Sequence, residues 1–588
     1  MKREKSNILS RRPESIIFML LIGLVSVLLN FTFSHNSFAE YKATLSASVN
    51  EDTAAIDGTD VIESSSETAE HAINLKVKTT NKTGYTATLS AKTDETALLN
   101  TNPAITTKIS SISSASSLSN FPANTWGYSF NANTDFNPIP ALSAPANLIH
   151  TTKKSTSEEN HTIKLGMKLN SSLKPGNYEN KLIISVVSNP YTPKAVMTEG
   201  QDFNEKLKDL ETATNKIEHF KNSTVAPAAS MNAVNIEDED SDYEIKLWLD
   251  PTDKTAYYYA ETEKVYLNED SIMMFYRSGS ELGLINILDI DLSSFNTSQV
   301  RDMRYMFEGM SSLTTLDLSN FDTSQVIDMR SMFSDMSNLT TLNLSNFDTS
   351  RVWNMQHMFY GMRGLTSLNL SSFNTSQVMY MGDMFEDMSN LISLNLSNFD
   401  TSKVTDMSGM FSDMSNLTSL NLSNFDTSQV TNMNFMFKGI SKLTTLDLSN
   451  FNTSKVTDMS GMFSDMSNLT SLNLSNFDTS QVKNMETMFD GMSNLTTLDL
   501  SNFDTSKVWN MRYMFSLEDK DIPKDKLEKI YVNNDFDTTR LTHFTKMFEN
   551  RKKLRGGNGS YLPNPSTADK TWLRVDRPGV QGYFTRKP

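Results

Sequence analysis

One motif recurs with a strict period of 26 residues and constrains the fold more than any other feature of the sequence. The pattern Phe-(Asp or Asn)-Thr-Ser-x-Val starts nine times without a slip in register, at Phe295, Phe321, Phe347, Phe373, Phe399, Phe425, Phe451, Phe477 and Phe503. A period of this length is typical of proteins built from stacked repeats, in which each unit packs only against its neighbours. Residues 295–516 are therefore expected to form an elongated stack of nine units.

Each unit is predicted to contain a turn, a helical segment and a short strand. In the second copy, residues 326–336 carry Val, Met and Phe at the spacing of one helix face, and the Asp-Thr-Ser of residues 322–324 offers N-cap side chains. Residues 339–344 then alternate as a strand does. A 26-residue unit cannot bury all these apolar side chains alone, so stacking should create columns of Phe, Met and Leu. Such columns would account for the 34 Met of the chain.

The composition argues against several classes of function. The 69 acidic and 53 basic residues give a formal net charge of −16, which disfavours nucleic acid as a partner. The chain has no Cys, and its seven His are scattered, so neither a thiolate metal site nor a catalytic triad is expected. No phosphate-binding loop or nucleophile motif occurs. We therefore expect no catalysis, no cofactor and no metal; a glycosidase carboxylate pair within residues 41–190 is the enzymatic alternative.

The first 39 residues have the pattern of a secretory signal peptide. Basic residues precede an apolar run over residues 16–29, and Ser37-Phe38-Ala39 offers small residues before Glu40. An uncleaved membrane anchor is the alternative, because the apolar stretch approaches the length of a span. Either interpretation predicts export, to the medium or to the cell surface. An exported chain without Cys also suggests a bacterial protein.

The remaining chain divides into segments of different composition. Residues 40–195 alternate polar and β-prone residues and predict a β-sandwich module, in which Trp126 is a core residue or, alternatively, part of a carbohydrate-stacking pair with Tyr128. A polar helix over 199–220 and a linker are expected within residues 196–235. The other expected parts are an N-terminal cap of the stack (236–294), the repeats (295–516), an insertion with a degenerate repeat (517–555) and a C-terminal closing segment (556–588).

The repeat resembles that of a known family. Its consensus, Phe-Asp-Thr-Ser-x-Val-x-Asp-Met-x-x-Met-Phe-x-x-Met-x-x-Leu-x-x-Leu-Asp-Leu-Ser-Asn, is similar to the 26-residue repeat of the BspA-like leucine-rich-repeat surface proteins of bacteria. The resemblance covers about residues 243–585, and it implies a leucine-rich-repeat solenoid at a cell surface that binds proteins or host matrix. The expected fold class is thus multidomain: an N-terminal all-β sandwich followed by an α/β leucine-rich-repeat solenoid with terminal caps. Many relatives hold Cys where this chain has Met336 and its counterparts.

Binding is expected at two repeat positions that vary between copies, both on the segment predicted to be helical. Arg301, Trp353 and Trp509 share one position, and Tyr305, His357, Phe435 and Tyr513 share the other. Exposed aromatic side chains are typical contact anchors, although drift on a solvated surface would give the same variation. We therefore predict an adhesion protein whose partners are host or bacterial surface proteins or matrix, with cell wall as a further candidate. The alternative function is a cell-envelope scaffold that binds cell wall or copies of itself. The membrane would be reached only through an uncleaved N-terminal segment.

Overall fold

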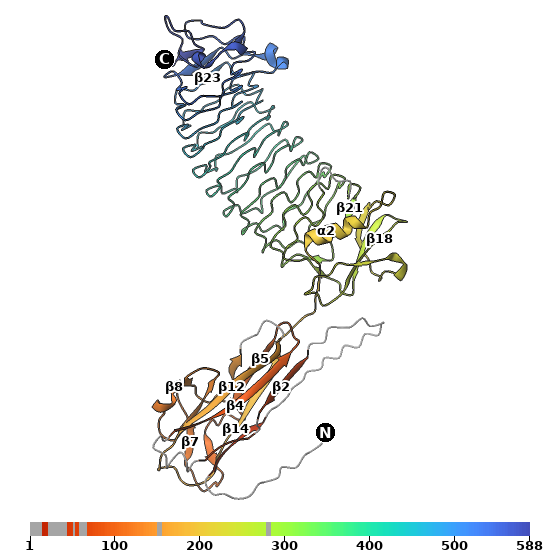
Figure 1. Cartoon of the computed structure of the whole chain (residues 1–588), viewed down its shortest axis with the longest axis vertical. Coiled ribbons are helices and arrows are strands. Elements are labelled where there is room, and N and C mark those ends of the chain that lie inside the picture. The colour runs from red at the N-terminus through yellow and green to blue at the C-terminus, as the bar shows by residue number, and fades with distance from the viewer. Residues whose placement is uncertain (1–14, 22–43, 51–52, 58–67, 150–155, 278–283) are drawn as a thin grey trace. The chain divides into compact units, whose positions relative to one another are not determined.

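The computed structural model describes residues 15–21, 44–50, 53–57, 68–149, 156–277 and 284–588. The chain forms two compact units, Met1–Pro193 and Lys194–Pro588, each with its own hydrophobic core (Figure 1).

The described residues of the first unit form strands and turns, with one short 3-10 helix, η1 (Leu118–Asn120). One sheet has the order β13-β6-β7-β9-β12-β4-β2 and another the order β11-β5-β14-β1-β3, while β8 and β10 form a separate pair. The strands are β1 (Ser15–Leu21), β2 (Leu45–Val49), β3 (Thr53–Asp57), β4 (Thr68–Thr79), β5 (Tyr85–Ala91), β6 (Leu98–Asn100), β7 (Lys108–Ser111), β8 (Ser116–Ser117), β9 (Thr125–Phe130), β10 (Asp135–Phe136), β11 (Ala146–Ile149), β12 (Thr156–Lys168), β13 (Tyr178–Glu179) and β14 (Lys181–Ser188).

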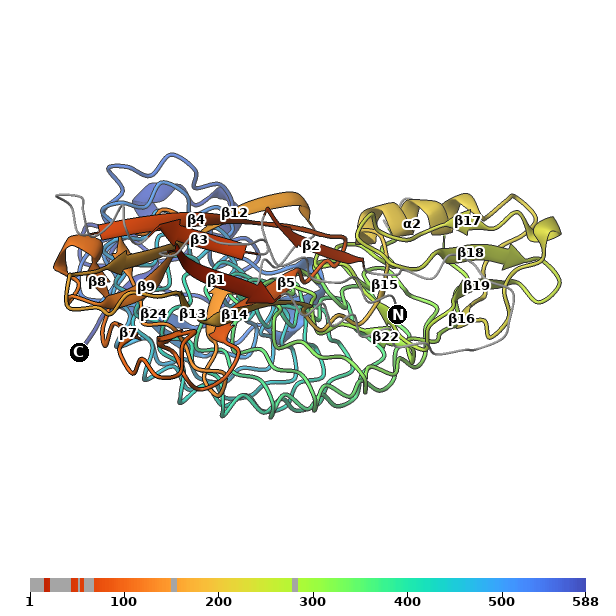
Figure 2. The same ribbon diagram turned by 90° about the horizontal axis from the view of Figure 1, so that it is seen from below.

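The two larger sheets share one core, because alternate residues of their strands point inward. Ile73 and Leu75 of β4 meet Leu89 of β5 and Ile184 of β14 in this core, all at most 2% exposed. Figure 2 shows β4 and β12 in one layer and β5 and β14 in the other. Trp126 is fully buried and donates a hydrogen bond from Nε1 to the carbonyl of Thr96 (3.0 Å), so it is a core residue.

The predicted signal peptide, residues 1–39, lies outside the described residues except for β1. The backbone of β1 pairs in parallel with β14 and antiparallel with β3. No helix in the described part of the chain is both long enough and apolar enough to cross a membrane.

The second unit opens with two small sheets and α2 (Gly200–Asp209), which pack around one aromatic cluster. The helix is shorter than the 199–220 predicted, and the segment expected to be a linker contributes strands to the sheets. Phe203 of α2 contacts Phe220 of β16 edge-on, with ring centroids 5.7 Å apart, and Phe220 stacks on Tyr258 of β19. The elements are β15 (Ala195–Val196), β16 (His219–Asn222), η2 (Ala229–Met231), β17 (Val234–Asn235), β18 (Ile245–Asp250), β19 (Thr255–Ala260), β20 (Val265–Tyr266), β21 (Asp289–Ile290) and β22 (Phe295–Asn296).

The repeats contain no helix, so the predicted α/β leucine-rich-repeat solenoid, and with it the predicted fold class, is wrong. Between β22 and β23 (Thr497–Asp499) the chain forms turns joined by isolated parallel bridges, such as that between Asp302 and Asp328. Each 26-residue repeat is one coil, and the coils lie one on another (Figure 1). In the described residues α2 is the only α-helix, and it precedes the repeats.

The hydrogen bonds of residues 326–336 explain why the helix predicted from their apolar spacing does not form. In this segment alternate amides donate to carbonyls of the next coil: Met329 to Asn354 (3.1 Å), Ser331 to Gln356 (2.9 Å). An α-helix would have used the same amides for bonds to residue i−4. Instead Ser331 and Asp335 adopt φ of 54° and 56°, in the left-handed region, and end two successive turns. Two such turns return the chain to the interior every three or four residues, which is the interval that a helix also gives.

The core of the stack is made of columns of identical side chains. Phe rings one coil apart stack nearly parallel, as Phe385, Phe411 and Phe437 do with centroids 6.0 Å apart. The Met column that contains Met407 is fully buried throughout the repeats. These side chains fill the interior that stacking creates, as the sequence predicted.

The polar residues of the motif join neighbouring coils. Thr323 is almost fully buried, and its hydroxyl donates to the carbonyl of Asp348 (2.9 Å) and accepts from the Asp348 amide (2.8 Å). The side chain of Asp322 accepts from the Ser324 amide (3.0 Å) and so caps a turn instead of a helix. The same bonds recur in the other repeats, so Asp, Thr and Ser of the motif have structural roles.

The stack ends in a three-stranded parallel sheet of β23, β24 and β25. Phe536, which starts the degenerate unit, packs against Phe584 of β25 with centroids 4.7 Å apart. Arg551 is buried here against Asp525 (2.9 Å). The elements are β24 (Lys529–Val532), β25 (Phe584–Arg586), η3 (Asp519–Lys524), η4 (Pro565–Thr567) and η5 (Lys570–Trp572).

Candidate interaction surface

Trp353 and Trp509 lie in a column of residues on one side of the stack, which we call the outer column. Its backbone forms a continuous ladder, because each amide donates to the carbonyl one coil earlier, as Trp353 does to Ile327 (3.0 Å) and Met379 to Trp353 (2.8 Å). The ladder fixes the backbone, and the side chains of the column are exposed or partly exposed. The column consists of Arg301, Ile327, Trp353, Met379, Thr405, Thr431, Thr457, Lys483 and Trp509.

Three neighbours in the outer column form an exposed hydrophobic strip. Ile327, Trp353 and Met379 are 39%, 39% and 40% exposed and belong to consecutive coils. The Trp353 ring contacts the Tyr380 ring edge-on, with centroids 5.7 Å apart, and this contact restricts the indole. We call Ile327, Trp353 and Met379 the apolar strip. Sequence reasoning identified Trp353 but missed Ile327 and Met379, although their shared repeat position was a signal that could have revealed them.

Tyr305, His357, Phe435 and Tyr513 lie in a second column, four residues further along each coil. All four have positive φ, between 55° and 59°, which is uncommon for residues with large side chains. The other copies hold Ser331, Asp383, Gly409, Gly461 and Thr487 at this position, also with positive φ. The column therefore marks an obligatory left-handed turn, whose side chain is free to vary.

The four predicted residues of the second column have different surroundings. The Tyr305 ring lies 5.0 Å from the Arg330 guanidinium carbon. His357 Nε2 lies 3.1 Å from an Asp383 carboxylate oxygen. Phe435 is 39% exposed. The Tyr513 ring lies 5.7 Å from the Arg512 guanidinium carbon. These residues do not converge on one site.

Two separate places combine the predicted residues. Trp353 and His357 belong to the third coil, beside the apolar strip. Trp509 and Tyr513 belong to the ninth coil, where the Trp509 ring contacts His543 edge-on at 5.1 Å and is 41% exposed. Trp353 and Trp509 are six coils apart, and at a spacing of about 4.8 Å per coil they lie roughly 30 Å from each other. Only the first place has further exposed hydrophobic neighbours, so it is the stronger candidate for a contact surface.

Carboxylates next to the second column have unusual proton affinities. Burial raises the pKa of Glu386 to about 8, with a further increase from its hydrogen bond to Asp383. Burial likewise raises the pKa of Glu308 to about 7, helped by the charge of Asp335. No group of three or more His, Asp or Glu in the described ranges is arranged to hold a metal ion. The carboxylates therefore make this side of the stack sensitive to pH.

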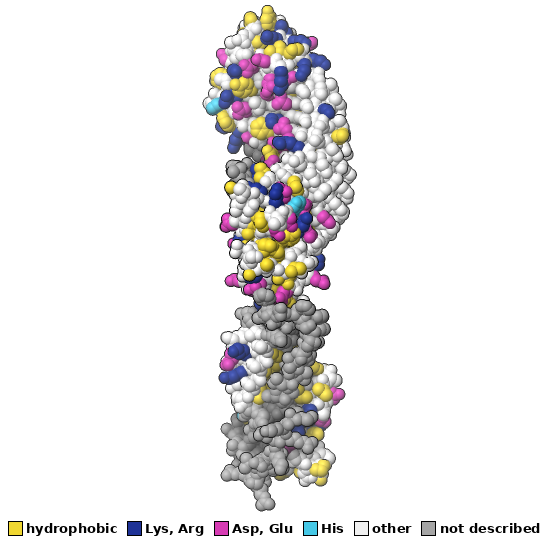
Figure 3. All heavy atoms as spheres, turned by 90° about the vertical axis from the view of Figure 1, so that its right-hand side faces the viewer, with side chains coloured by type: hydrophobic (Ala, Val, Ile, Leu, Met, Phe, Trp, Pro, Cys, Tyr) yellow, Lys and Arg dark blue, Asp and Glu magenta, His cyan; other side chains and the backbone are white. Residues whose placement is uncertain are grey.

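The surface beside these columns is polar and largely uncharged. Most repeats expose two hydroxyl residues, an Asn or Asp and a Ser on the short extended segment, such as Thr340, Thr341, Asn343 and Ser345; in the fourth repeat the first of these is Ile392, which is 55% exposed. Figure 3 shows a broad surface of the repeats with few charged or hydrophobic side chains, next to a zone where both kinds gather. Ile392, Phe435 and Trp509 are also exposed hydrophobic residues of the repeats, but the apolar strip is the place where three such residues occupy the same position on consecutive coils.

Comparison with known proteins identifies the repeat. Three overlapping matches, over residues 274–394, 383–472 and 462–567, are to the family described as Mycoplasma protein of unknown function, DUF285. Together they span half of the chain. The chain belongs to this family. The tandem DUF285 matches confirm that the chain is a repeat protein, and the description of DUF285 states no function. No curated protein and no solved structure matches the chain.

Proposed function

We propose that this DUF285 protein is an exported adhesion protein of a bacterial surface, and that the apolar strip is its main contact with a partner protein. The observation that carries the proposal is the strip itself: three large hydrophobic side chains, each about 40% exposed, on consecutive coils. A soluble stack gains nothing from such a row unless a partner covers it. The same column holds Thr in three later coils, so the repeat does not need hydrophobic residues there.

The strip has the properties of a binding hot spot. Trp is among the residue types that contribute most to protein interfaces, and Met adapts its shape to a partner. The indole of Trp353 is fixed by Tyr380 and by the backbone ladder, so little conformational entropy is lost on binding. His357 and Arg351 near the strip offer polar contacts for its rim.

The sequence supports the remaining parts of the proposal. The N-terminal pattern of residues 1–39 favours export, and the absence of a catalytic motif favours binding without chemistry. The similarity to the BspA-like surface proteins favours a partner in host matrix or on another cell, although the leucine-rich-repeat fold of that resemblance does not apply. Nine similar coils also provide several weaker contacts whose effects add up.

Binding to a defined panel tests the proposal. The purified protein is offered to immobilised fibronectin, fibrinogen, collagen, mucin and isolated bacterial cell wall. We expect saturable binding to at least one host protein. Trp353→Thr should weaken that binding by about 30-fold or more, since truncating a hot-spot residue costs at least ~2 kcal/mol.

The repeats supply a matched control. Thr405, Thr431 and Thr457 occupy the position of Trp353 in other coils, so Trp353→Thr places a residue that the coil already accepts. Thr457→Ala changes the same column away from the strip and should leave binding unchanged. Binding to cell wall alone would favour the scaffold alternative. Equal binding by wild type and Trp353→Thr would refute the strip as the contact.

A further inference from the structure

The end of the chain has a charge opposite to that of the whole. Residues 551–588, which we call the basic cap, contain nine Lys or Arg and two Asp, a net charge of +7, whereas the complete chain carries −16. The whole-chain charge therefore hides a strongly positive region at the last coils of the stack.

Most cations of the basic cap lack an acidic partner. Ion pairs join Arg551 to Asp525, Arg577 to Asp535 and Lys587 to Asp499. The other six make no ion pair with the described residues: Lys552, Lys553, Arg555, Lys570, Arg574 and Arg586. Arg555 lies over the ring of Tyr561, with its guanidinium carbon 4.3 Å from the ring centroid. Unpaired cations at this density are costly to the folded chain unless an anion covers them.

Two adjoining hollows open among these cations, each with a volume of about 500 Å³: 510 Å³ for one and 520 Å³ for the other. Arg574 lines the first, Arg586 lines the second, and Arg577 lines both. Volumes of this size are typical of sites for small ligands or for one or two units of a polymer. The hollows are open and polar, so a ligand would lie in them with part of its surface in solvent.

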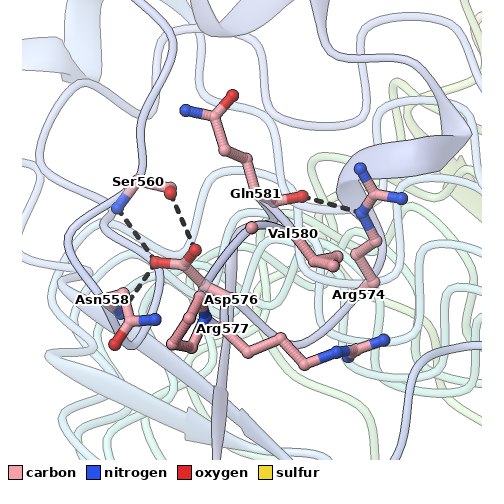
Figure 4. Close-up of a pocket in the computed structure, with 9 residues that line it drawn as sticks. Asn558, Ser560, Arg574, Asp576, Arg577, Val580 and Gln581 are labelled. Carbon is pink, nitrogen blue, oxygen red and sulfur yellow. Dashed lines mark hydrogen bonds between the residues drawn. The ribbon is translucent and has the colours of Figure 1, made fainter.

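The two carboxylates in the hollows are already occupied. Asp576 accepts hydrogen bonds from the amides of Asn558 (2.7 Å) and Ser560 (3.0 Å) and from the Ser560 hydroxyl (2.7 Å), as Figure 4 shows. Asp535 is held by both terminal nitrogens of Arg577 (2.8 and 3.0 Å). Both acids therefore shape the loops and leave the other two arginines to a ligand.

Free polar groups surround the first hollow. Arg574 uses Nε to bind the carbonyl of Gln581 (2.7 Å), so its two terminal nitrogens stay available among the described residues. Figure 4 shows the side chains of Arg574, Gln581 and Asn558 around the hollow. The side-chain amides of Gln581 and Asn558 make no hydrogen bond with the described part of the chain, and amides both donate and accept. The lining therefore combines guanidinium groups for an anion with amides for hydroxyl groups.

We propose that the basic cap binds an acidic polysaccharide, with Arg574 and Arg586 holding carboxylate groups of uronic acid units. The terminal nitrogens of an arginine match a carboxylate in a bidentate pair. The amides of Gln581 and Asn558 supply partners for the ring hydroxyls. Lys552, Lys553 and Lys570 are exposed and add positive charge to the basic cap outside the hollows, which favours an anionic polymer.

The same features disfavour other anionic partners. Binding to a lipid surface is strengthened by exposed apolar side chains that enter the membrane, and among the described residues of the basic cap Tyr561 is the one large exposed hydrophobic residue, with Arg555 over one face of its ring. Single-stranded nucleic acid would need several free aromatic faces for the bases. This site lies in the closing segment of the stack and does not depend on the apolar strip.

Binding of the whole protein to hyaluronan, a polymer rich in uronic acid, tests the proposal, with neutral dextran, phosphatidylglycerol vesicles and single-stranded DNA as comparisons. We expect saturable, salt-dependent binding to hyaluronan and none to dextran. Arg586→Gln, an exposed side chain without an internal partner, should weaken binding by about tenfold, the typical effect of one charge-assisted contact. Arg574→Gln in addition should abolish it.

The repeats provide a control of equal charge. Lys403→Gln with Lys455→Gln removes two cations that bind Gln377 and Gln429 on other coils, and it should leave hyaluronan binding unchanged. Trp353→Thr should also leave it unchanged, which separates this site from the proposed adhesion surface. Equal losses in the two double variants, no binding to hyaluronan, or binding to vesicles or DNA alone would each overturn the proposal.

Discussion

Replacing Arg551 by Met is expected to release the end of the chain from the last coils. The Arg551 side chain is 1% exposed and forms an ion pair with Asp525, which is 2% exposed. Its guanidinium also donates to three main-chain carbonyls, those of Phe489, Met492 and Phe515. One side chain thus satisfies acceptors of the eighth and ninth coils together with a buried carboxylate.

The expected magnitude follows from the burial of both partners. Removing one member of a buried ion pair leaves the other charge uncompensated and costs about 3–5 kcal/mol. In a stack of repeats each unit contacts only its neighbours, so the loss should stay local. Hydrogen exchange measures it: the amides of Phe515 and Leu517, which donate to Met547 (2.9 Å) and Glu549 (3.0 Å), should lose protection by a factor of about 100 or more, while the central coils keep theirs.

A surface arginine is the matched control. Arg363 pairs with Asp387, but its side chain is 57% exposed, so Arg363→Met should cost less than about 1 kcal/mol and leave exchange unchanged at the C-terminal end. Adding Asp525→Leu to Arg551→Met should restore part of the protection, because no charge then stays buried without a partner. The reasoning fails if Arg551→Met and Arg363→Met have the same effect on amide exchange at the C-terminal end, or if Arg551→Met lowers protection in all coils together.

Three further predictions concern the repeats. Phe411→Ala removes a fully buried ring between Phe385 and Phe437 and should lower the free energy of unfolding by about 3–5 kcal/mol in urea titrations; a loss under ~1 kcal/mol would contradict the packed column. Glu386 has a folded-state pKa of about 8, above its ordinary 4.5, so its protonated form stabilises the fold: that stability is complete below about pH 4.5 and is lost as the pH rises through 8. Glu386→Gln should flatten the fall in urea midpoint between pH 5 and pH 8, and an unchanged slope would refute the assignment. Gly461 has φ of 60°, and a Cβ there would lie 2.2 Å from the Phe435 ring, so Gly461→Ala should destabilise by at least ~1–2 kcal/mol, whereas Thr487→Gly at the equivalent position should stabilise by about 1 kcal/mol, both measured by thermal unfolding.

The strict period of the repeat made the interior of the stack predictable. Residues that recur every 26 positions must contact their own copies, so the burial of Phe411 and Met407 follows from the sequence alone. The same reasoning placed Trp353 at a variable, exposed position. This prediction did not require the backbone path, because equivalent positions of stacked repeats lie one above another whatever conformation each repeat adopts.

The path of the backbone was not predictable, since two conformations share one apolar spacing. Val326, Met329 and Met332 fit a helix face and also fit two tight turns. The turns depend on left-handed residues at the positions of Ser331 and Asp335, where other copies hold Tyr, His, Phe or Thr that carry no such signal. The hint lay in the Gly and Asp that recur at these two positions, and helical periodicity concealed it.

The positive end of the chain was missed for a different reason. A net charge of −16 describes the whole chain, whereas a binding site is governed by the charges within a Debye length of it, about 8 Å at physiological salt. Residues 551–588 carry +7, and the fold gathers Arg574, Arg577 and Arg586 around adjoining hollows. Counting charge by segment would have revealed the cap, but the hollows depend on loop packing that the sequence does not show.

Oxidative footprinting of the complex with the host protein that binds best would locate the contact on this DUF285 protein directly. Hydroxyl radicals label exposed side chains, and Ile327, Trp353 and Met379 are all exposed in the free protein. We predict that the bound partner protects Trp353 and Met379 strongly while Trp509 and Tyr561 stay as reactive as before. Unchanged labelling of the apolar strip in a saturated complex, with protection elsewhere on the coils, would contradict the proposed surface.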